Sequence, residues 1–209
     1  MKLQQFQKLP VLGILRGGTP DIIPALAETL VVAGLETVEI TLNTPQAPVM
    51  IQEMVRSGGG RLVVGAGTVL TRDAAAMARD AGATFIVSPV LIDEVAAFCV
   101  TCKMPFFPGA LTPQEIYQAW QAGAAMVKVF PAKFFGPAYF KEIKGPFAEI
   151  GLLACGGVTP ETLASYFVNG ASAVAFGGSV FRREWLNPGG LSRIAEGVRL
   201  LLQAYRTLA

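Results

Sequence analysis

Eight short apolar runs recur along the chain at intervals of roughly 20–26 residues, and helical patterns separate them. Each run has the length and the Val, Ile and Phe content of a strand that is buried on both faces, as in a parallel sheet. The predicted strands are 11–16, 37–42, 62–66, 85–88, 105–109, 126–130, 151–155 and 173–177. The predicted helices between and after them include Ile22–Ala33, Ala47–Arg56, Ala74–Ala81, Asp93–Cys102, Glu115–Ala122, Thr162–Val168 and a final helix from Leu191 to Tyr205.

Strands that alternate with helices pair in parallel through right-handed crossovers, and eight such units close into a (β/α)₈ TIM barrel. We therefore predict an α/β fold with a single domain over residues 1–209, preceded by a short N-terminal helix from Lys2 to Lys8. The alternative is an open, doubly wound sheet. It is less favoured because no G-x-G-x-x-G follows the first strand.

Threonine followed by proline marks the expected start of four helices. The pairs are Thr19-Pro20, Thr44-Pro45, Thr112-Pro113 and Thr159-Pro160, and each follows an apolar run. Threonine is a favoured N-cap, and proline fits the first helical turn because it lacks the N–H that would stay unpaired there. We therefore expect the threonine of each pair to cap a helix, with Glu115 completing a capping box.

Composition excludes several classes of function. The formal net charge is +2 and the seventeen basic residues are scattered, so no basic stripe predicts a nucleic-acid partner. No apolar run approaches the roughly 18–20 residues that span a bilayer, so no membrane partner is expected. The segment from Met1 to Gly18 is interrupted by Pro10 and has no small-residue cleavage site, which favours a cytoplasmic protein without a targeting segment.

The chain contains no histidine. This excludes Ser-His and Cys-His nucleophile pairs, imidazole general bases and most zinc sites. Cys99 and Cys102 form a C-x-x-C motif, but with only Cys155 besides them they cannot supply four zinc ligands. The motif falls in a helical pattern, so we expect a packing role for it rather than a redox role.

Lys128 is the one charge in the apolar strand 126–130. Strand alternation places Met126, Lys128 and Phe130 on one face. Burial disfavours the ammonium form, which makes a lysine amine nucleophilic and able to form a Schiff base with a carbonyl substrate. The alternative is a structural lysine that pairs with a buried carboxylate.

Glu39 is the corresponding acidic residue in strand 37–42. Val38 and Ile40 suit the face that packs on helices, so Glu39 is expected to point into the barrel. An inward carboxylate and an inward amine form either an internal ion pair or an acid/base pair.

Several segments together resemble one family. They are Val38-Glu39-Ile40-Thr41, Gly65-Ala66-Gly67-Thr68-Val69, Ile86-Val87-Ser88-Pro89, Phe107-Pro108-Gly109, Val127-Lys128-Val129-Phe130-Pro131-Ala132, Gly145-Pro146-Phe147, Gly156-Gly157-Val158 and Gly177-Gly178-Ser179. In order and spacing they are similar to the signature segments of the class I 2-keto-3-deoxy-6-phosphogluconate (KDPG) and 4-hydroxy-2-oxoglutarate (KHG) aldolases, which include a phosphogalactonate branch.

The resemblance implies catalytic roles for Lys128 as the Schiff-base residue and for Glu39 as the general acid/base. It also implies that Thr68, Pro89 and Phe130 line the pyruvate pocket. For Thr68 the alternative is an N-cap or turn hydroxyl, and Phe130 would otherwise be a core residue. The chemistry implied is that of a covalent lysine imine, with no cofactor and no metal.

The glycine pairs after the last two strands suit a phosphate group. Gly156, Gly157, Gly177, Gly178 and Ser179 end these strands, where backbone N–H groups of a barrel commonly bind phosphate. Ordinary turn glycines are the alternative.

Two positions depart from the phosphogluconate pattern. Asn43 stands where many members carry an arginine that reaches the substrate carboxylate, and Arg16 is the candidate to replace that charge. Cys155 stands where phosphogluconate enzymes have threonine. A similar arrangement of Leu-Arg-Gly at Arg16 and Leu-Asn at Asn43 is what we associate with the phosphogalactonate branch. The loss of a hydroxyl at Cys155 leaves the stereochemical preference open.

The resemblance implies an aldolase that cleaves 2-keto-3-deoxy-6-phosphogluconate to pyruvate and glyceraldehyde 3-phosphate, with KHG as a second substrate and the phosphogalactonate epimer as the alternative. It also suggests a homotrimer. Two other classes remain open, namely a sugar-phosphate isomerase or epimerase and a non-catalytic sugar-phosphate binding protein.

Overall fold

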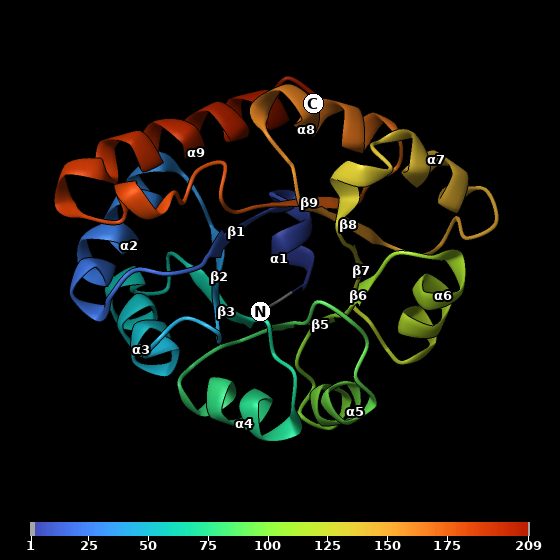
Figure 1. The fold of residues 1–209 in the computed structure, drawn as a ribbon, viewed down its shortest axis with the longest axis horizontal. Helices are drawn as coiled ribbons and strands as arrows, with labels where there is room; N and C mark the ends of the chain where they lie inside the picture. Colours follow the sequence, from blue (N-terminus) through green and yellow to red (C-terminus); the bar gives the residue numbers. More distant parts are fainter. Residues whose placement is uncertain (1–2, 209) are drawn as a thin grey trace.

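A computed structural model describes residues 3–208, in which parallel strands form one sheet at the centre of a ring of helices (Figure 1). The strands are β1 (Val11–Leu15), β2 (Thr37–Thr41), β3 (Val63–Gly67), β4 (Ile86–Val87), β5 (Phe106–Phe107), β6 (Gly109–Ala110), β7 (Val127–Val129), β8 (Leu152–Cys155) and β9 (Ala173–Phe176). Their order is β5-β4-β3-β2-β1-β9-β8-β7-β6, and every pairing is parallel.

The sheet closes through the segment that was predicted as strand 105–109. Pro108 divides this segment into β5, which pairs with β4, and β6, which pairs with β7. The Pro108 carbonyl accepts a hydrogen bond of 2.9 Å from the Lys128 backbone N–H, so pairing continues across the interruption. The two ends of the sheet are therefore halves of one strand. The predicted (β/α)₈ barrel is confirmed, and the open sheet is wrong.

The helices are α1 (Leu3–Lys8), α2 (Ile23–Ala33), α3 (Ala47–Gly58), α4 (Arg72–Asp80), α5 (Asp93–Thr101), α6 (Pro113–Gln121), α7 (Ala138–Lys144), α8 (Pro160–Val168) and α9 (Leu191–Arg206). Four short 3₁₀ turns are also present, namely η1 (Pro20–Ile22), η2 (Ala132–Phe134), η3 (Arg183–Trp185) and η4 (Pro188–Gly190). Helix α7 was not predicted from the sequence. Within residues 3–208, no helix is long and apolar enough to cross a membrane.

Two apolar cores stabilise the barrel. The outer core lies between strands and helices and includes Val38, Ile40, Val127 and Val129. The inner core fills the barrel, and its members are Phe6, Leu12, Phe85, Val87, Phe107, Met126, Leu153, Cys155, Ala173 and Ala175. The alternation predicted for β2 and β7 is thus observed.

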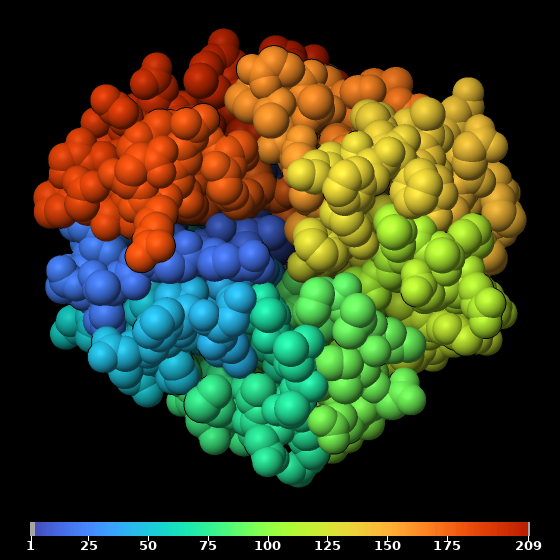
Figure 2. Space-filling model, in the orientation of Figure 1, coloured from blue at the N-terminus to red at the C-terminus, as the bar shows by residue number. Residues whose placement is uncertain are grey.

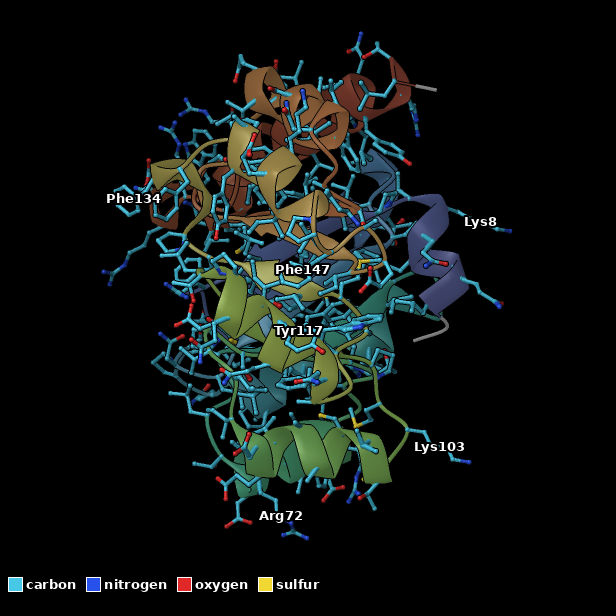
Figure 3. All side chains as sticks on the ribbon, turned by 90° about the vertical axis from the view of Figure 1, so that its right-hand side faces the viewer. Lys8, Arg72, Lys103, Tyr117, Phe134 and Phe147 are labelled. Carbon is cyan, nitrogen blue, oxygen red and sulfur yellow. The ribbon has the colours of Figure 1, made fainter. Side chains whose placement is uncertain are left out.

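The N-terminal helix closes one end of the barrel. Phe6 of α1 packs edge-to-face on Phe107, with ring centroids 5.9 Å apart. Figure 3 shows Lys8 of α1 on one side of the molecule and Phe134, from the loop after β7, on the opposite side. The same view shows Tyr117 beside Phe147, whose rings stack at 5.6 Å. A ligand site is therefore expected at the end away from α1, where the strands have their carboxyl ends.

The predicted capping box of Thr112 and Glu115 is confirmed. Thr19 and Thr159 occupy the N-cap positions of η1 and α8, but the Thr19 side chain makes no capping hydrogen bond, and at Thr159 it is the backbone N–H that donates to Thr162 Oγ1, at 2.9 Å. The prediction for Thr44 is wrong, because α3 begins at Ala47. The Thr44 Oγ1 instead accepts a hydrogen bond of 2.9 Å from the Gly17 N–H, which ties the loop after β2 to the loop after β1.

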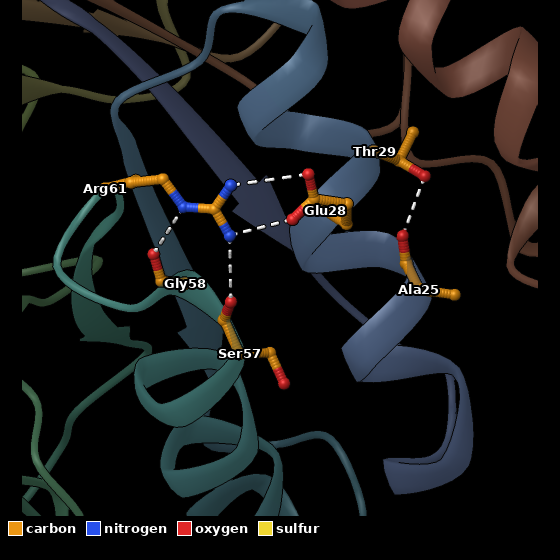
Figure 4. A network of polar contacts seen from close by, with 6 residues as sticks. All are labelled: Ala25, Glu28, Thr29, Ser57, Gly58 and Arg61. Atoms are coloured by element: carbon orange, nitrogen blue, oxygen red, sulfur yellow. Dashed lines mark hydrogen bonds and ion pairs between the residues drawn. The ribbon is translucent and has the colours of Figure 1, made fainter.

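Surface polar contacts hold α2 against the segment before β3 (Figure 4). Arg61 donates to both carboxylate oxygens of Glu28, at 3.3 and 2.7 Å, and to the carbonyls of Ser57 and Gly58. The pair is exposed, so its contribution to stability is small.

Candidate active site

A cavity of about 640 Å³ opens at the carboxyl ends of the strands. It is lined by almost all of the residues that the sequence singled out, namely Arg16, Glu39, Thr68, Pro89, Lys128, Phe130, Cys155, Gly156, Gly157, Gly177, Gly178 and Ser179. Asn43 is the exception, because it is exposed in the loop after β2 and does not line the cavity.

Lys128 lies at the middle of β7, with a side chain that is almost fully buried. Its neighbours in register are Gly109 of β6 and Leu153 of β8. The Lys128 Nζ lies 5.0 Å from the centroid of the Phe130 ring. Phe130 is 39% exposed, so it forms a wall of the cavity and is not a core residue.

Glu39 is 1% exposed at the centre of β2. Burial raises the pKa of its carboxyl to about 7, although the charges of Lys128 and Arg16 act in the opposite direction. Its Oε2 atom has no hydrogen-bond partner within residues 3–208. A buried carboxyl with a free oxygen and a pKa near neutrality is suited to accept and return a proton.

Cys155 at the end of β8 lies beside both groups. Burial raises the pKa of its thiol to about 11, although the charge of Lys128 acts in the opposite direction. The thiol is therefore neutral at physiological pH and is a small apolar wall next to the amine.

The other two cysteines lie away from this cavity. Cys99 is buried in the outer core and Cys102 caps α5, where its sulfur accepts a hydrogen bond of 3.5 Å from Arg79. Neither one forms a disulfide, and in the described part of the chain no group of three or more acidic, cysteine or histidine side chains is placed to hold a metal ion. The positions of Cys99 in the outer core and of Cys102 at the end of α5 support a packing role for the C-x-x-C motif.

Thr68 follows β3 with a φ of 55°, a conformation that β-branched residues rarely adopt. It does not cap α4, because Thr71 is the N-cap and accepts a hydrogen bond from the Ala74 N–H. The Thr68 hydroxyl makes no hydrogen bond to another described residue, so it is available to a ligand. Backbone strain at a cavity wall is typical of functional sites.

The glycine loops after β8 and β9 present backbone donors to the cavity. Gly156 and Gly157 have φ values of 96° and 86°, which side chains disfavour. Ser179 Oγ donates to the Val158 carbonyl at 3.1 Å, which joins the two loops. Within residues 3–208, the N–H groups of Gly157, Val158, Gly178 and Ser179 have no acceptor. A row of free N–H groups is suited to bind an anion such as phosphate.

Sequence reasoning missed the residues that the segment after β9 brings to the rim. These are Phe181, Arg182, Arg183 and Glu184. Ile14 and Ala175 of the strands and Val158 of the loop after β8 also line the cavity. The available signal was the position of Arg182-Arg183-Glu184 in the loop that follows β9, since loops that follow barrel strands lie at the active-site end.

A parallel barrel whose cavity opens at the carboxyl ends of the strands and is lined by a buried amine and a buried carboxyl is typical of a barrel enzyme. The KDPG and KHG aldolase family model matches residues 2–196. The 2-dehydro-3-deoxy-6-phosphogalactonate aldolase of Escherichia coli (strain K12) is 36% identical over 205 residues, which are 98% of each chain. The 2-dehydro-3-deoxy-phosphogluconate aldolase of Pseudomonas aeruginosa is 38% identical over 159 residues, covering 76% of this chain and 70% of that one.

A solved structure described as native KDPGal superposes with a TM-score of 0.90 at 36% identity and covers 96% of both chains. The chain belongs to the KDPG and KHG aldolase family. It is therefore an aldolase, a carbon–carbon lyase, as the sequence analysis predicted. The relatives include enzymes named for both the phosphogalactonate and the phosphogluconate series.

Proposed function

We propose that the protein is a class I, Schiff-base aldolase that releases pyruvate from a phosphorylated 2-keto-3-deoxy sugar acid, with Lys128 as nucleophile. 2-Keto-3-deoxy-6-phosphogluconate, which gives glyceraldehyde 3-phosphate as co-product, is the substrate we propose first. The observation that carries the proposal is the pair of buried groups in one cavity, the Lys128 amine and the Glu39 carboxyl with a pKa of about 7.

The reaction begins when the neutral Lys128 amine attacks the C2 carbonyl carbon of the keto acid. Proton transfers through Glu39 convert the carbinolamine into an iminium ion and release water. Glu39 then takes the proton of the C4 hydroxyl, the C3–C4 bond breaks, and the electron pair moves to the iminium nitrogen. The aldehyde leaves, the enamine takes a proton at C3, and water hydrolyses the imine to pyruvate and the free amine.

The two ends of the substrate fit opposite parts of the cavity. The free N–H groups of the loops after β8 and β9, including those of Gly157 and Gly178, would bind the terminal phosphate. At the other end, Arg16 is the candidate for the carboxylate, since a guanidinium binds a carboxylate through two parallel hydrogen bonds. Thr68, Pro89 and Phe130 would enclose the pyruvate carbons.

The phosphogalactonate epimer is the second candidate substrate. Cys155 favours it, because the buried thiol lies next to Lys128 and offers a weaker donor than the hydroxyl that phosphogluconate enzymes carry there. Unphosphorylated 4-hydroxy-2-oxoglutarate, which would give pyruvate and glyoxylate, is a further candidate. Rates of cleavage of the two C4 epimers and of this dicarboxylate, measured side by side, decide among the three.

Covalent trapping tests the Schiff base. Wild-type protein is incubated with pyruvate, reduced with borohydride and analysed by mass spectrometry, and an adduct on Lys128 is expected. Lys128→Met should form none, whereas Lys141→Met, which changes an exposed residue of α7, should form it as the wild type does. Folded wild-type protein without an adduct would contradict the proposal and favour an isomerase, an epimerase or a binding protein.

The oligomeric state and the extent of the catalytic unit are also proposals. We propose a cytoplasmic homotrimer in which residues 1–209 form one aldolase domain. Phe134 and Phe135 support association, because they are 73% and 57% exposed on the loop after β7. Light scattering coupled to gel filtration should give three times the chain mass of 22.1 kDa. A particle of one chain mass would contradict it.

A further inference from the structure

The segment that follows β9 folds back onto the loop that follows β1. Leu186 Cδ1 lies 3.9 and 3.7 Å from the positions that a Cβ would occupy on Gly17 and Gly18. Figure 2 shows the orange-red surface of this segment meeting the blue surface of the loop. Gly190 is packed so closely on the backbone of Trp185 that a Cβ would overlap it. These contacts hold η3 in a defined place on the rim of the cavity.

The two arginines of this segment differ in their surroundings. The Arg182 guanidinium lies 4.7 Å from the Trp185 ring centroid, and its Nη1 lies 4.0 Å from Glu184 Oε1. The Arg183 guanidinium has no hydrogen bond, ion pair or aromatic contact within residues 3–208. Arg182 is therefore engaged in packing the rim, while all five donors of Arg183 are available.

Arg183 lines two adjoining hollows. One is the catalytic cavity, and the other is a hollow of about 720 Å³ between the loops after β1 and β2. Arg16 lines both hollows as well, and the second one has no acidic residue in its walls. In the catalytic cavity the Glu39 carboxyl interacts with the charge of Arg16, whereas no acidic residue lines the second hollow. The Arg183 guanidinium, which has no partner within residues 3–208, therefore offers its charge and its donors to an anion that reaches the rim shared by the two hollows.

We propose that Arg183 is a specificity-determining residue that, together with Arg16, binds an anionic oxygen group of the substrate. This inference rests on the proposed function, which supplies a substrate with a carboxylate at one end and a phosphate at the other. The planar guanidinium suits either group, because both accept two parallel hydrogen bonds. Arg183 lies outside the reacting pair of Lys128 and Glu39, so its role is in binding rather than in bond cleavage.

Steady-state kinetics of Arg183→Gln test this role. With the phosphorylated sugar acid, KM should rise about tenfold, equivalent to about 1.4 kcal/mol, while kcat stays within twofold. Arg183→Lys should lie between the wild type and Arg183→Gln, because it keeps the charge but loses the bidentate geometry. The matched control is Arg199→Gln, which changes an exposed arginine of α9 outside both hollows and should leave the kinetics unchanged.

Product inhibition identifies the group that Arg183 binds. Pyruvate and inorganic phosphate are each measured as inhibitors of cleavage by wild type and by Arg183→Gln. If the variant has a higher inhibition constant than the wild type for pyruvate only, Arg183 binds the carboxylate. If its inhibition constant is higher for inorganic phosphate only, Arg183 binds the phosphate. The inference is overturned if KM stays within twofold of wild type, or if KM rises while neither inhibition constant changes. If the wild type cleaves the phosphorylated sugar acid and Arg183→Gln has the same kinetic constants, only this inference is refuted. If the wild type does not cleave the substrate, the proposed function is refuted.

Discussion

The carboxyl group of Glu39 lies directly against the backbone of Gly67, on the neighbouring strand of the barrel. A Cβ on Gly67 would lie 2.6 Å from the Glu39 Cδ, much closer than a carbon–carbon contact allows. The register pairs Thr41 with Gly67, two residues beyond Glu39 on β2. The absence of a side chain at Gly67 therefore creates the space in which the carboxyl is held.

Gly67→Ala should displace the Glu39 carboxyl and lower kcat by about 100-fold, since a displacement of about 1 Å at a catalytic group can cost that much. The matched control is Gly189→Ala, the same change in a surface turn where a Cβ would meet only Asn187 Oδ1 at 3.4 Å. Rates of pyruvate release measure the effect. A kcat within twofold of wild type for Gly67→Ala would show that the carboxyl position is not critical.

The raised pKa of Glu39 predicts the acidic limb of the pH profile. Because the retro-aldol step needs the carboxylate form, kcat/KM should fall about tenfold per pH unit below pH about 7. Glu39→Gln should lower kcat by 10²- to 10⁴-fold, as expected for loss of a general base, and should abolish this limb. An unchanged acidic limb in the variant would assign it to another group.

The same carboxyl makes the stability of the fold depend on pH. Burial raises the folded-state pKa of Glu39 from 4.5 to about 7, so the folded state favours the protonated form. That contribution is fully present below pH 4.5 and is lost as the pH rises to 7, with a total on the order of 3 kcal/mol. Glu39→Gln should therefore unfold at the same urea concentration as wild type near pH 4 and at a higher one at pH 8. Equal midpoints at both pH values would contradict this.

The positive φ of Thr68 predicts opposite effects on stability and activity. Thr68→Gly removes the strain, so the melting temperature should rise by about 2–4 °C, equivalent to about 1 kcal/mol in a chain of this size. The loss of the hydroxyl and methyl groups should lower kcat/KM about tenfold. Thr71→Ala, which removes the cap of α4, should lower the melting temperature by a similar amount without changing activity. A less stable Thr68→Gly variant would contradict the assignment of strain.

The sequence predicted the barrel and its reacting pair because both depend on local periodicity. Apolar runs set the strands to within a residue or two, and the period of two in β2 and β7 turned Glu39 and Lys128 inward. A shift of one residue would turn the buried apolar side chains of a strand to the opposite face and the charged side chain into the outer core. Because such a shift is costly, the alternation in the sequence predicts which side chains face inward. Nothing comparable fixes a side chain that follows the end of a strand, and Asn43, which was grouped with the site through the family resemblance, is exposed outside the cavity.

Features that depend on long-range packing could not be predicted. Thr44 has the sequence of a helix cap, but its hydroxyl is taken by the Gly17 N–H from another loop. Arg183 reaches the cavity only because Leu186 packs on the glycines after β1, and no local pattern specifies that contact. The seven-residue helix α7 is too short to show a helical period clearly.

Gly178 offers the sharpest test of the phosphate assignment. A Cβ at this position would meet nothing within 4 Å, and the backbone is not in the left-handed region, so Gly178→Asp should fold like wild type. Its carboxylate would enter the space next to the free N–H groups and repel a phosphate, which should raise KM for the phosphorylated sugar acid at least tenfold. The rate of pyruvate adduct formation on Lys128 should not change, because pyruvate carries no phosphate.

Gly178→Asn, with the same size and no charge, is the matched control and should have a much smaller effect. Equal effects of Asp and Asn would show that bulk rather than charge is responsible, and the phosphate would then bind elsewhere in the cavity.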